Sequence, residues 1–406
     1  MRAAVSAMLL AAFGAACLST SGLDDGTRPA CNADLQTDVA NCGACGNACG
    51  SAANAAVTCA AGKCTSTCNA GSIDCNKDPS DGCEATLAGD PKNCSACGRD
   101  CLGGACNGSV CQPITIQSVT GQPSGIAVDD SGVYFGLNPP GGTTSEVVRI
   151  AKDGSGAQPL VLNRSNVSAI AIDDTFVYWV EVNGGANGRI LKAPKDGSSG
   201  VPQTVATGLA VTASAQLVID SPNAIWSAYG VDDGTGTGTL VGGGVYSCAL
   251  AGCGSAPNVL ASFEEVNGVA VSPPSIFFGI DALTPGPGAF DCPIGGCSGA
   301  PALVPGATAA AVQLAADSAG VTWTTSAGVA RYSGTSLTMV ASGLAGLHAV
   351  VTDNTNVYFT SISGGSVYAC PVAGCTGAPI IMASGLTSPA YIAADVTAIY
   401  VSSGSG

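Results

Sequence analysis

Histidine occurs once in the 406 residues, at His348, and this scarcity excludes several kinds of active site. Zinc hydrolase motifs need two histidines at fixed spacing. The sequence also has no G-x-S-x-G nucleophile elbow and no G-x-x-x-x-G-K-[ST] phosphate-binding loop. We interpret His348 as a structural residue of an inner strand, because no second histidine accompanies it. A hydrolase that uses only carboxylates stays open, since paired acids act through proximity in space.

Charged residues are also scarce, and the positive ones most of all. Only 10% of the residues are charged, and 13 Lys and Arg stand against 28 Asp and Glu, for a net charge of −15. A chain this acidic repels phosphate backbones and anionic lipid headgroups, so nucleic acid and a charged membrane surface are excluded as partners. The 57 glycines favour turn-rich β-structure over helices.

Long apolar runs are missing after the first 16 residues, so no transmembrane helix is expected there. Arg2 and the small apolar residues 3–16 are typical of an export signal, and this stretch is too short to span the bilayer core with room to spare. Cys17 follows directly. Residues 17–30 are polar and lack periodicity, which predicts a tether.

Cysteine parity indicates an oxidising compartment. Of 21 cysteines, fourteen lie within 31–111, six form three C-x4-C pairs, and Cys17 is the odd one. The six are Cys248, Cys253, Cys292, Cys297, Cys370 and Cys375. We expect the even set to form ten disulfides, with each C-x4-C pair stapling a hairpin. Zinc binding by the C-x2-C-x3-C clusters is the alternative.

Residues 31–111 form a cysteine-rich module with an internal repeat. The stretches CNADLQTDVANCGACGNAC (31–49) and CEATLAGDPKNCSACGRDC (83–101) share one cysteine spacing, and each is followed by a C-x4-C pair. Few large apolar residues are present, so disulfides must stabilise the module in place of a core. Between the copies, Asp74, Asn76 and Asp78 alternate like calcium ligands, and Asp81 and Glu84 follow. A calcium site is one interpretation, and a solvated acidic turn is the other.

From residue 112 a different repeat begins, which predicts an all-β fold of the β-propeller class. Seven segments share an apolar run that ends at an anchor residue, followed by an apolar-aromatic run. The anchors are Asp129, Asp173, Asp220, Ser272, Asp317, Asp353 and Asp395, between 36 and 52 residues apart. All three tryptophans fall six residues after an anchor. A repeat of this length with short alternating strands is typical of four-stranded blades.

The number of blades depends on how the ring closes. The seventh repeat stops after its second strand, and ITIQSV (114–119) looks like an orphan fourth strand that would complete the last blade. We prefer seven blades and keep six as the alternative. The anchor aspartates are interpreted as turn residues that bond their own backbone, and the repeated aromatic residues as inter-blade core.

These motifs resemble known families. DPKNCSACGRDC is similar to cysteine-rich repeats of exported bacterial proteins and to the STIG1-like type, while VYWVE and VYFTS resemble the YWTD and NHL propellers. Gly14-Ala15-Ala16 before Cys17 resembles a bacterial lipobox. The resemblance implies an exported lipoprotein, lipidated at Cys17 and sorted to the outer membrane, with a binding scaffold and no catalytic residues. Ordinary cleavage, with Cys17 removed or left free, is the alternative.

The longest loops between second and third strands point to a ligand-binding face. They carry Tyr229, Asp232, Asp233 and Asp281, in neighbouring repeats. Long loops on a rigid ring commonly carry binding residues. We therefore expect a monomeric binding or scaffolding protein, membrane-associated only through a lipid anchor, whose partner is a polar ligand, glycan or protein. A periplasmic lactonase-like or lyase-like enzyme and a purely structural envelope protein are the alternatives.

Overall fold

The computed structural model describes residues 32–78, 81–101, 104–141, 144–235, 240–282 and 286–404. The predicted signal segment, Cys17 and the tether lie outside these residues. The chain divides into two compact units, Met1–Glu84 and Ala85–Gly406. The second cysteine-rich repeat therefore belongs to the same unit as the ring of blades.

The smaller unit is stabilised by disulfides. Its strands are β1 (Ala55–Ala60), β2 (Lys63–Cys68) and β3 (Ser72–Ile73), of which β1 and β2 pair antiparallel. Its disulfides include Cys42–Cys59, Cys49–Cys64 and Cys68–Cys83. Among the residues described here, the buried hydrophobic side chains of this unit are cysteines. Covalent cross-links thus replace an apolar core, as expected for so small a body.

The second copy of the cysteine repeat opens the larger unit. It contains β4 (Ala85–Thr86), β5 (Cys106–Asn107) and β6 (Val110–Cys111). Its disulfides Cys94–Cys106 and Cys101–Cys111 match those of the first copy. Arg99 donates a hydrogen bond of 2.9 Å to the carbonyl oxygen of Ile381 in the outer strand of blade 6, which is described next.

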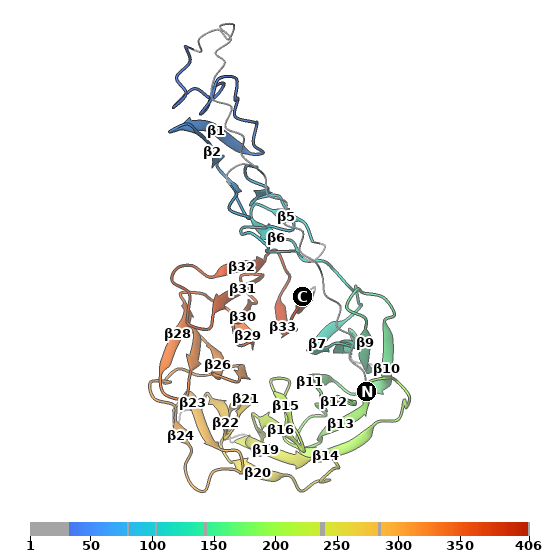
Figure 1. Ribbon diagram of the computed structural model, residues 1–406. Coiled ribbons are helices and arrows are strands. Elements are labelled where there is room, and N and C mark those ends of the chain that lie inside the picture. The colour runs from blue at the N-terminus through green and yellow to red at the C-terminus, as the bar shows by residue number, and fades with distance from the viewer. Residues whose placement is uncertain are drawn as a thin grey trace, which may run out of the picture. The chain divides into compact units, whose positions relative to one another are not determined.

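The ring consists of six four-stranded antiparallel blades, so the predicted propeller is confirmed (Figure 1). Blade 1 has β7 (Gln122–Asp129), β8 (Gly132–Asn138), β9 (Ser145–Ile150) and β10 (Gln158–Arg164). Blade 2 has β11 (Val167–Ile172), β12 (Phe176–Glu181), β13 (Gly188–Pro194) and β14 (Gln203–Leu209). Blade 3 has β15 (Leu217–Asp220), β16 (Asn223–Ala228), β19 (Gly244–Ala249) and β20 (Asn258–Ala261).

The remaining blades follow the same order. Blade 4 has β21 (Val266–Ser272), β22 (Ser275–Ile280), β23 (Gly288–Pro293) and a short β24 (Ala302–Leu303). Blade 5 has β25 (Leu314–Asp317), β26 (Gly320–Thr325), β27 (Gly328–Tyr332) and β28 (Leu337–Ser342). Blade 6 has β29 (Leu347–Thr352), β30 (Asn356–Ser361), β31 (Ser366–Pro371) and β32 (Ile380–Ala383).

The seventh repeat forms only a hairpin, which corrects the preferred count of seven blades to the alternative of six. Strands β33 (Pro389–Ala394) and β34 (Ile399–Ser403) pair with each other, and β33 contacts β29 on one side and β7 on the other. Residues 114–119 form no strand, contrary to the prediction. They lie where a fourth strand would, since Ile116 packs with Tyr400 and approaches Gly154 in the turn of blade 1.

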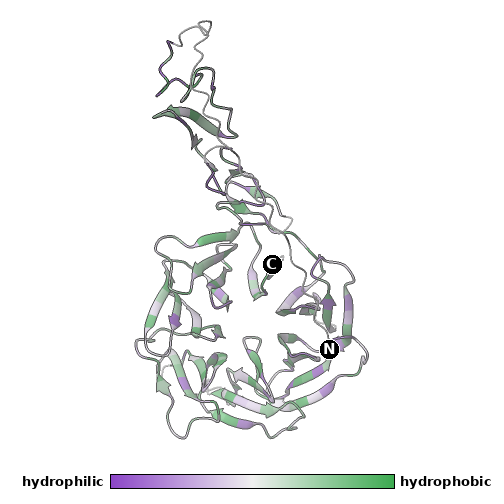
Figure 2. Cartoon of the chain, viewed as in Figure 1, coloured by the Kyte–Doolittle hydropathy of each residue, from purple (hydrophilic) through white to green (hydrophobic). Residues whose placement is uncertain are grey.

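The aromatic residues of the second strands form the core between blades. Trp179, Trp226 and Trp323 are at most 1% exposed. Rings of the second strand stack on their cross-strand partners in the third, with centroids 5.9 Å apart for Trp226 and Tyr246. Figure 2 shows hydrophobic segments recurring in strands around the ring. The repeated aromatic position is therefore explained by packing.

Anchor aspartates set the turns between first and second strands. The Oδ1 atoms of Asp129, Asp173 and Asp395 each accept a hydrogen bond of 2.7–2.8 Å from the backbone amide two residues on. Two anchors also bind a lysine from the next blade around the ring. Lys195 of blade 2 pairs with Asp129, and Lys152 of blade 1 pairs with Asp395 at 2.7 Å. The second pair shows that the β33–β34 hairpin occupies the place of a blade preceding blade 1.

Candidate functional site

The long loop of blade 3 contains an additional two-stranded hairpin. Strands β17 (Val231–Asp232) and β18 (Leu240–Val241) pair antiparallel between β16 and β19. Gly243 closes the hairpin so near the backbone of the following loop that a Cβ there would lie 2.5 Å from the carbonyl oxygen of Phe263. The described part of this insertion is thus packed onto the ring.

Two of the predicted ligand-binding residues are brought together through a third that the sequence did not suggest. The backbone amide of Glu265 donates to the carbonyl oxygen of Tyr229 at 2.9 Å, and the amide of Asp281 donates to that of Glu265 at 3.1 Å. Burial, followed by the charges of Glu265 and Asp281, raises the pKa of the Tyr229 hydroxyl. The loops of blades 3 and 4 therefore share a negatively charged surface.

Glu265 has an unusual backbone conformation that marks its position. Its φ is +58°, a left-handed value that non-glycine residues rarely adopt. The same place before the first strand holds Asn166 in blade 2 and Gly346 in blade 6, both also with positive φ. Asparagine and glycine suit this conformation, whereas glutamate does not. In the sequence, Glu265 could have been found as a glutamate at a repeat position where other blades have asparagine or glycine.

Asp232 and Asp233 lie on the hairpin and are exposed. Their carboxylates accept hydrogen bonds from the backbone amides of Gly234 and Thr235, at 2.7 and 2.9 Å. These bonds shape the turn of the insertion. The contacts among the described residues do not link either aspartate to Tyr229, so the structure joins only Tyr229 and Asp281 of the four predicted residues.

The predicted calcium ligands lie in a turn that is held by their own side chains. Asp74 accepts from the amide of Lys77 at 2.5 Å, and Asn76 donates to the Asp81 carboxylate at 2.9 Å. Glu84 accepts from the amide of Cys75 at 3.0 Å. A calcium ion would have to replace these bonds. Calcium at Asp74, Asn76, Asp78 and Asp81 stays a prediction.

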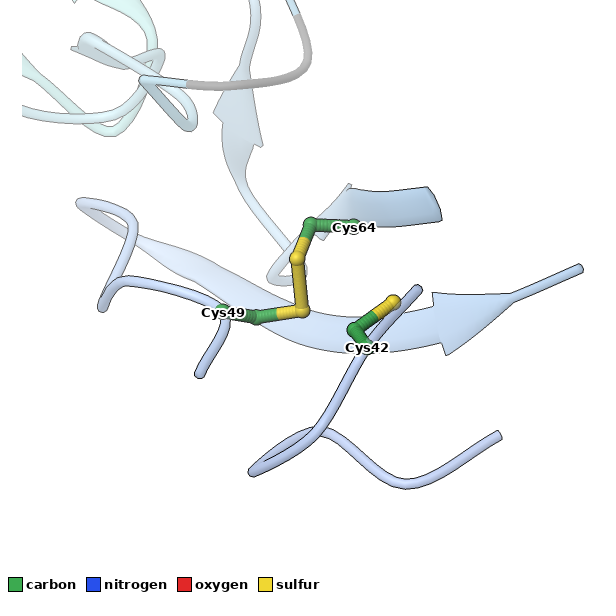
Figure 3. Close-up of side chains that lie close together, drawn as sticks. All are labelled: Cys42, Cys49 and Cys64. Atoms are coloured by element: carbon green, nitrogen blue, oxygen red, sulfur yellow. A yellow bond between two sulfur atoms is a disulfide. The ribbon is translucent and has the colours of Figure 1, made fainter. Parts of the chain in front are cut away.

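Two groups of cysteine sulfurs lie close enough to hold a metal. They are Cys42, Cys49 and Cys64 in the first repeat, and Cys94, Cys101 and Cys111 in the second. Figure 3 shows the first group, with the Cys49–Cys64 disulfide beside Cys42. Cys42 is itself bonded to Cys59, so no thiolate of this group is available to zinc. Each group is a pair of neighbouring disulfides, equivalent in the two copies.

The remaining sequence candidates are structural in this arrangement. Disulfides Cys248–Cys253, Cys292–Cys297 and Cys370–Cys375 join the third strand to the turn before the fourth. Cys253, Cys297 and Cys375 also donate their backbone amides to the outer strand of the preceding blade, at 2.8–2.9 Å. His348 bonds to the carbonyl oxygen of Ala390 at 2.8 Å and contacts the Tyr391 ring edge-on. It thus links blade 6 to the closing hairpin.

A second polar group that sequence reasoning missed lies at the ends of blades 1 and 2. Glu181, fully buried, forms ion pairs with Arg164 and Arg189 and accepts a hydrogen bond of 3.2 Å from the Trp179 indole. Its counterparts two residues after the aromatic position are apolar or small, such as Leu137 and Ala228. Its members come from three different strands, with Arg189 and Arg164 lying 8 and 17 residues from Glu181, so no single local motif predicts the cluster.

Comparison with solved structures supports the propeller fold. The chain is similar to a catalytically inactive virginiamycin B lyase from Staphylococcus aureus in complex with quinupristin, with a TM-score of 0.50 and 14% identity over 72% of this chain and 95% of that one. Weaker matches include a chain of a nidogen/laminin complex (TM-score 0.42, 16% identity, 57% of this chain and 88% of that one). A gluconolactonase from Xanthomonas campestris also matches (TM-score 0.42, 14% identity, 61% and 85%).

At these identities the similarity establishes the fold alone. No protein-family model matches the chain, and no curated protein sequence is significantly similar to it. The many disulfides indicate an oxidising, exported environment. The described part of the chain contains no helix long and apolar enough to cross a membrane.

Proposed function

We propose that the chain is an exported binding or scaffolding protein that recognises a polar partner, a glycan or a protein of the cell envelope, through the loops of blades 3 and 4. The observation that supports this proposal is that backbone hydrogen bonds connect the two loops to each other. The β17–β18 hairpin packs onto the ring, and Tyr229, Glu265 and Asp281 are joined by backbone hydrogen bonds. Loops held in this way by a rigid scaffold are suited to binding without reorganisation.

The chemistry of this face favours a cationic or hydroxyl-rich partner. The carboxylates of Glu265 and Asp281 lie near enough to the Tyr229 hydroxyl for their charges to raise its pKa, and the hairpin adds the exposed Asp232 and Asp233. Carboxylates accept hydrogen bonds from hydroxyl and ammonium groups. The tyrosine offers a rigid ring for stacking against a sugar or an aliphatic chain.

The location proposed with this function is the outer membrane, with a lipid on Cys17 as the only membrane attachment and the protein acting as a monomer. Mass spectrometry of the mature N-terminus tests the anchor. We expect a lipid-modified cysteine at position 17. An unmodified N-terminus downstream of Cys17 would reject the anchor and leave the binding proposal standing.

Point variants of neighbouring glutamates test the binding face. Glu265→Gln removes the charge beside Tyr229, whereas Glu264→Gln removes an exposed charge one residue away. Glycan arrays and envelope extracts should yield partners of the wild-type protein. We expect Glu265→Gln to weaken their binding at least tenfold and Glu264→Gln to change it less than twofold. Equal loss in both variants would mean that only net charge matters, and the proposed face would be wrong.

A further inference from the structure

A pocket of about 260 Å³ lies at the ends of blades 1 and 2, away from the loops of blades 3 and 4. It is lined by residues 138–139 and 144–145 of blade 1 and by residues 164–166, which lead from β10 to β11. Its lining contains two asparagines, two serines, one threonine, one arginine and one proline, and no carboxylate. In a chain of net charge −15, a pocket whose only charge is a guanidinium is unexpected.

The guanidinium belongs to Arg164, and its orientation is fixed from behind. Nε donates to the carbonyl oxygen of Leu162 at 3.1 Å, and Nη1 lies 3.5 Å from Oε1 of Glu181. Glu181 is shared with Arg189, so two positive charges face one negative charge. The cluster therefore carries one uncompensated positive charge. An arginine held in this way presents its remaining N–H groups as a preorganised anion site.

The other polar side chains of the pocket are of two kinds: some are already hydrogen-bonded within the protein, and others can bond to a ligand. Asn138 uses its amide on both backbone groups of Val167 and accepts from Ser145 at 2.6 Å, so these side chains are committed to joining the blades. Ser165 and Asn166 have no side-chain partner among the described residues. Asn166 also has a left-handed φ of +30°, which turns the chain at the mouth of the pocket.

We propose that this pocket binds a carboxylate-bearing sugar, such as a hexuronic acid unit. Arg164 pairs with the carboxylate, and Ser165 and Asn166 hydrogen-bond to ring hydroxyls. One net positive charge matches the single charge of a carboxylate, and the hydroxyl and amide lining matches a polyol. The volume lies just below the usual range of ligand pockets, which limits the occupant to a single sugar ring. This site is separate from the face of blades 3 and 4 and does not depend on it.

The experiment measures binding of three probes to the whole mature protein by calorimetry or ligand-observed NMR. The probes are methyl galacturonide, the neutral methyl galactoside and N-acetylglycine, which carries a carboxylate without the sugar. We expect the uronide to bind at least tenfold more tightly than either other probe, and more weakly as salt is raised. If the uronide and the galactoside bind equally, Arg164 does not recognise a carboxylate and the proposal is wrong. If N-acetylglycine binds as tightly as the uronide, the pocket does not recognise a sugar and the proposal is also wrong.

Variants separate the site from the fold. Arg164→Gln and Arg189→Gln each remove one charge from the same cluster, but only Arg164 lines the pocket. We expect Arg164→Gln to lower uronide affinity at least tenfold and Ser165→Ala severalfold. Arg189→Gln removes the net charge of the cluster but no group that lines the pocket, so it should lower the affinity clearly less than Arg164→Gln does. An unchanged affinity in Arg164→Gln would overturn the proposal. Glu265→Gln should bind the uronide like the wild type, so failure of this site and failure of the blade 3–4 face are distinguishable.

Discussion

The ion pair between Lys152 and Asp395 offers a direct test of how the ring closes. Lys152 lies in blade 1 and Asp395 in the closing hairpin, with side chains 27% and 11% exposed and Nζ 2.7 Å from the carboxylate. Replacing Lys152 with Met keeps the aliphatic stem and removes the charge. Fully exposed pairs contribute about 0–1 kcal/mol, and hydrogen bonds to charged groups about 1.5–3 kcal/mol. For a pair of intermediate burial we expect a loss of about 1–2 kcal/mol.

The equivalent pair inside the ring supplies the comparison. Lys195 and Asp129 have side chains 11% and 26% exposed and join blade 2 to blade 1 in the same way. Lys195→Met should therefore cost as much as Lys152→Met. The exposed Lys92→Met should change the free energy of unfolding by less than about 0.5 kcal/mol. The assay is urea unfolding followed by tryptophan fluorescence, with the midpoint and slope fitted together.

The pH dependence of this pair has a definite sign. Burial raises the pKa of Asp395, but the Lys152 ammonium beside it and hydrogen bonds from Thr397 outweigh the effect of burial and hold that pKa well below the usual range. The contribution of Asp395 to the free energy of unfolding is thus present above its pKa in the unfolded chain, about 3.9, and is lost as the pH falls further. The bond to Asp395 raises the pKa of Lys152, so that contribution is complete below about pH 10.4 and is lost at higher pH. A Lys152→Met effect of zero at pH 7, with a full effect for Lys195→Met, would refute closure by the hairpin.

Three further predictions follow from the buried charge, the disulfides and the acidic turn. Glu181→Ala should lower the free energy of unfolding by about 3–5 kcal/mol, because two arginines lose their buried counter-charge; a cost like that of the exposed Glu264→Ala would show that Glu181 is dispensable. Thiol titration of the denatured, unreduced mature protein should find almost no free thiol in residues 31–406, and several reactive thiols or stoichiometric zinc would contradict the disulfide assignment. Calcium should raise the melting temperature of the whole chain and Asp78→Ala should abolish that shift, whereas equal melting with calcium and with chelator rejects the site.

Local sequence signals predicted the parts of this fold that repeat. The aromatic residue six positions after the anchor of each of the six blades is buried because each blade faces the next in the same way, so Trp179, Trp226 and Trp323 could be recognised as core. The anchor turns at Asp129 and Asp173 depend on residues only two positions away, and they too were predictable. Period and turn chemistry are properties of short segments.

The parts that were not predictable depend on residues far apart in the chain. ITIQSV has the composition of a strand, but without a paired neighbour Ile116 and Val119 only pack against an apolar cluster formed by blade 1 and Tyr400 of the hairpin. Glu181 is an isolated glutamate in the sequence, and only the fold brings Arg164 and Arg189 to it. Glu265 likewise became a candidate only when its backbone was seen to join Tyr229 and Asp281. Functional residues of this kind are defined by tertiary contacts.

The measurement that tests the proposed function most directly compares the binding profiles of two proteins on the same glycan arrays and envelope extracts. One is the wild type, and the other has residues 230–242 shortened to a tight turn. Loop length costs little stability, so circular dichroism and melting should show an intact ring in both proteins. We predict that partners bound by the wild type are lost or weakened at least tenfold in the shortened protein. Identical profiles from two folded proteins would contradict a binding face on blades 3 and 4.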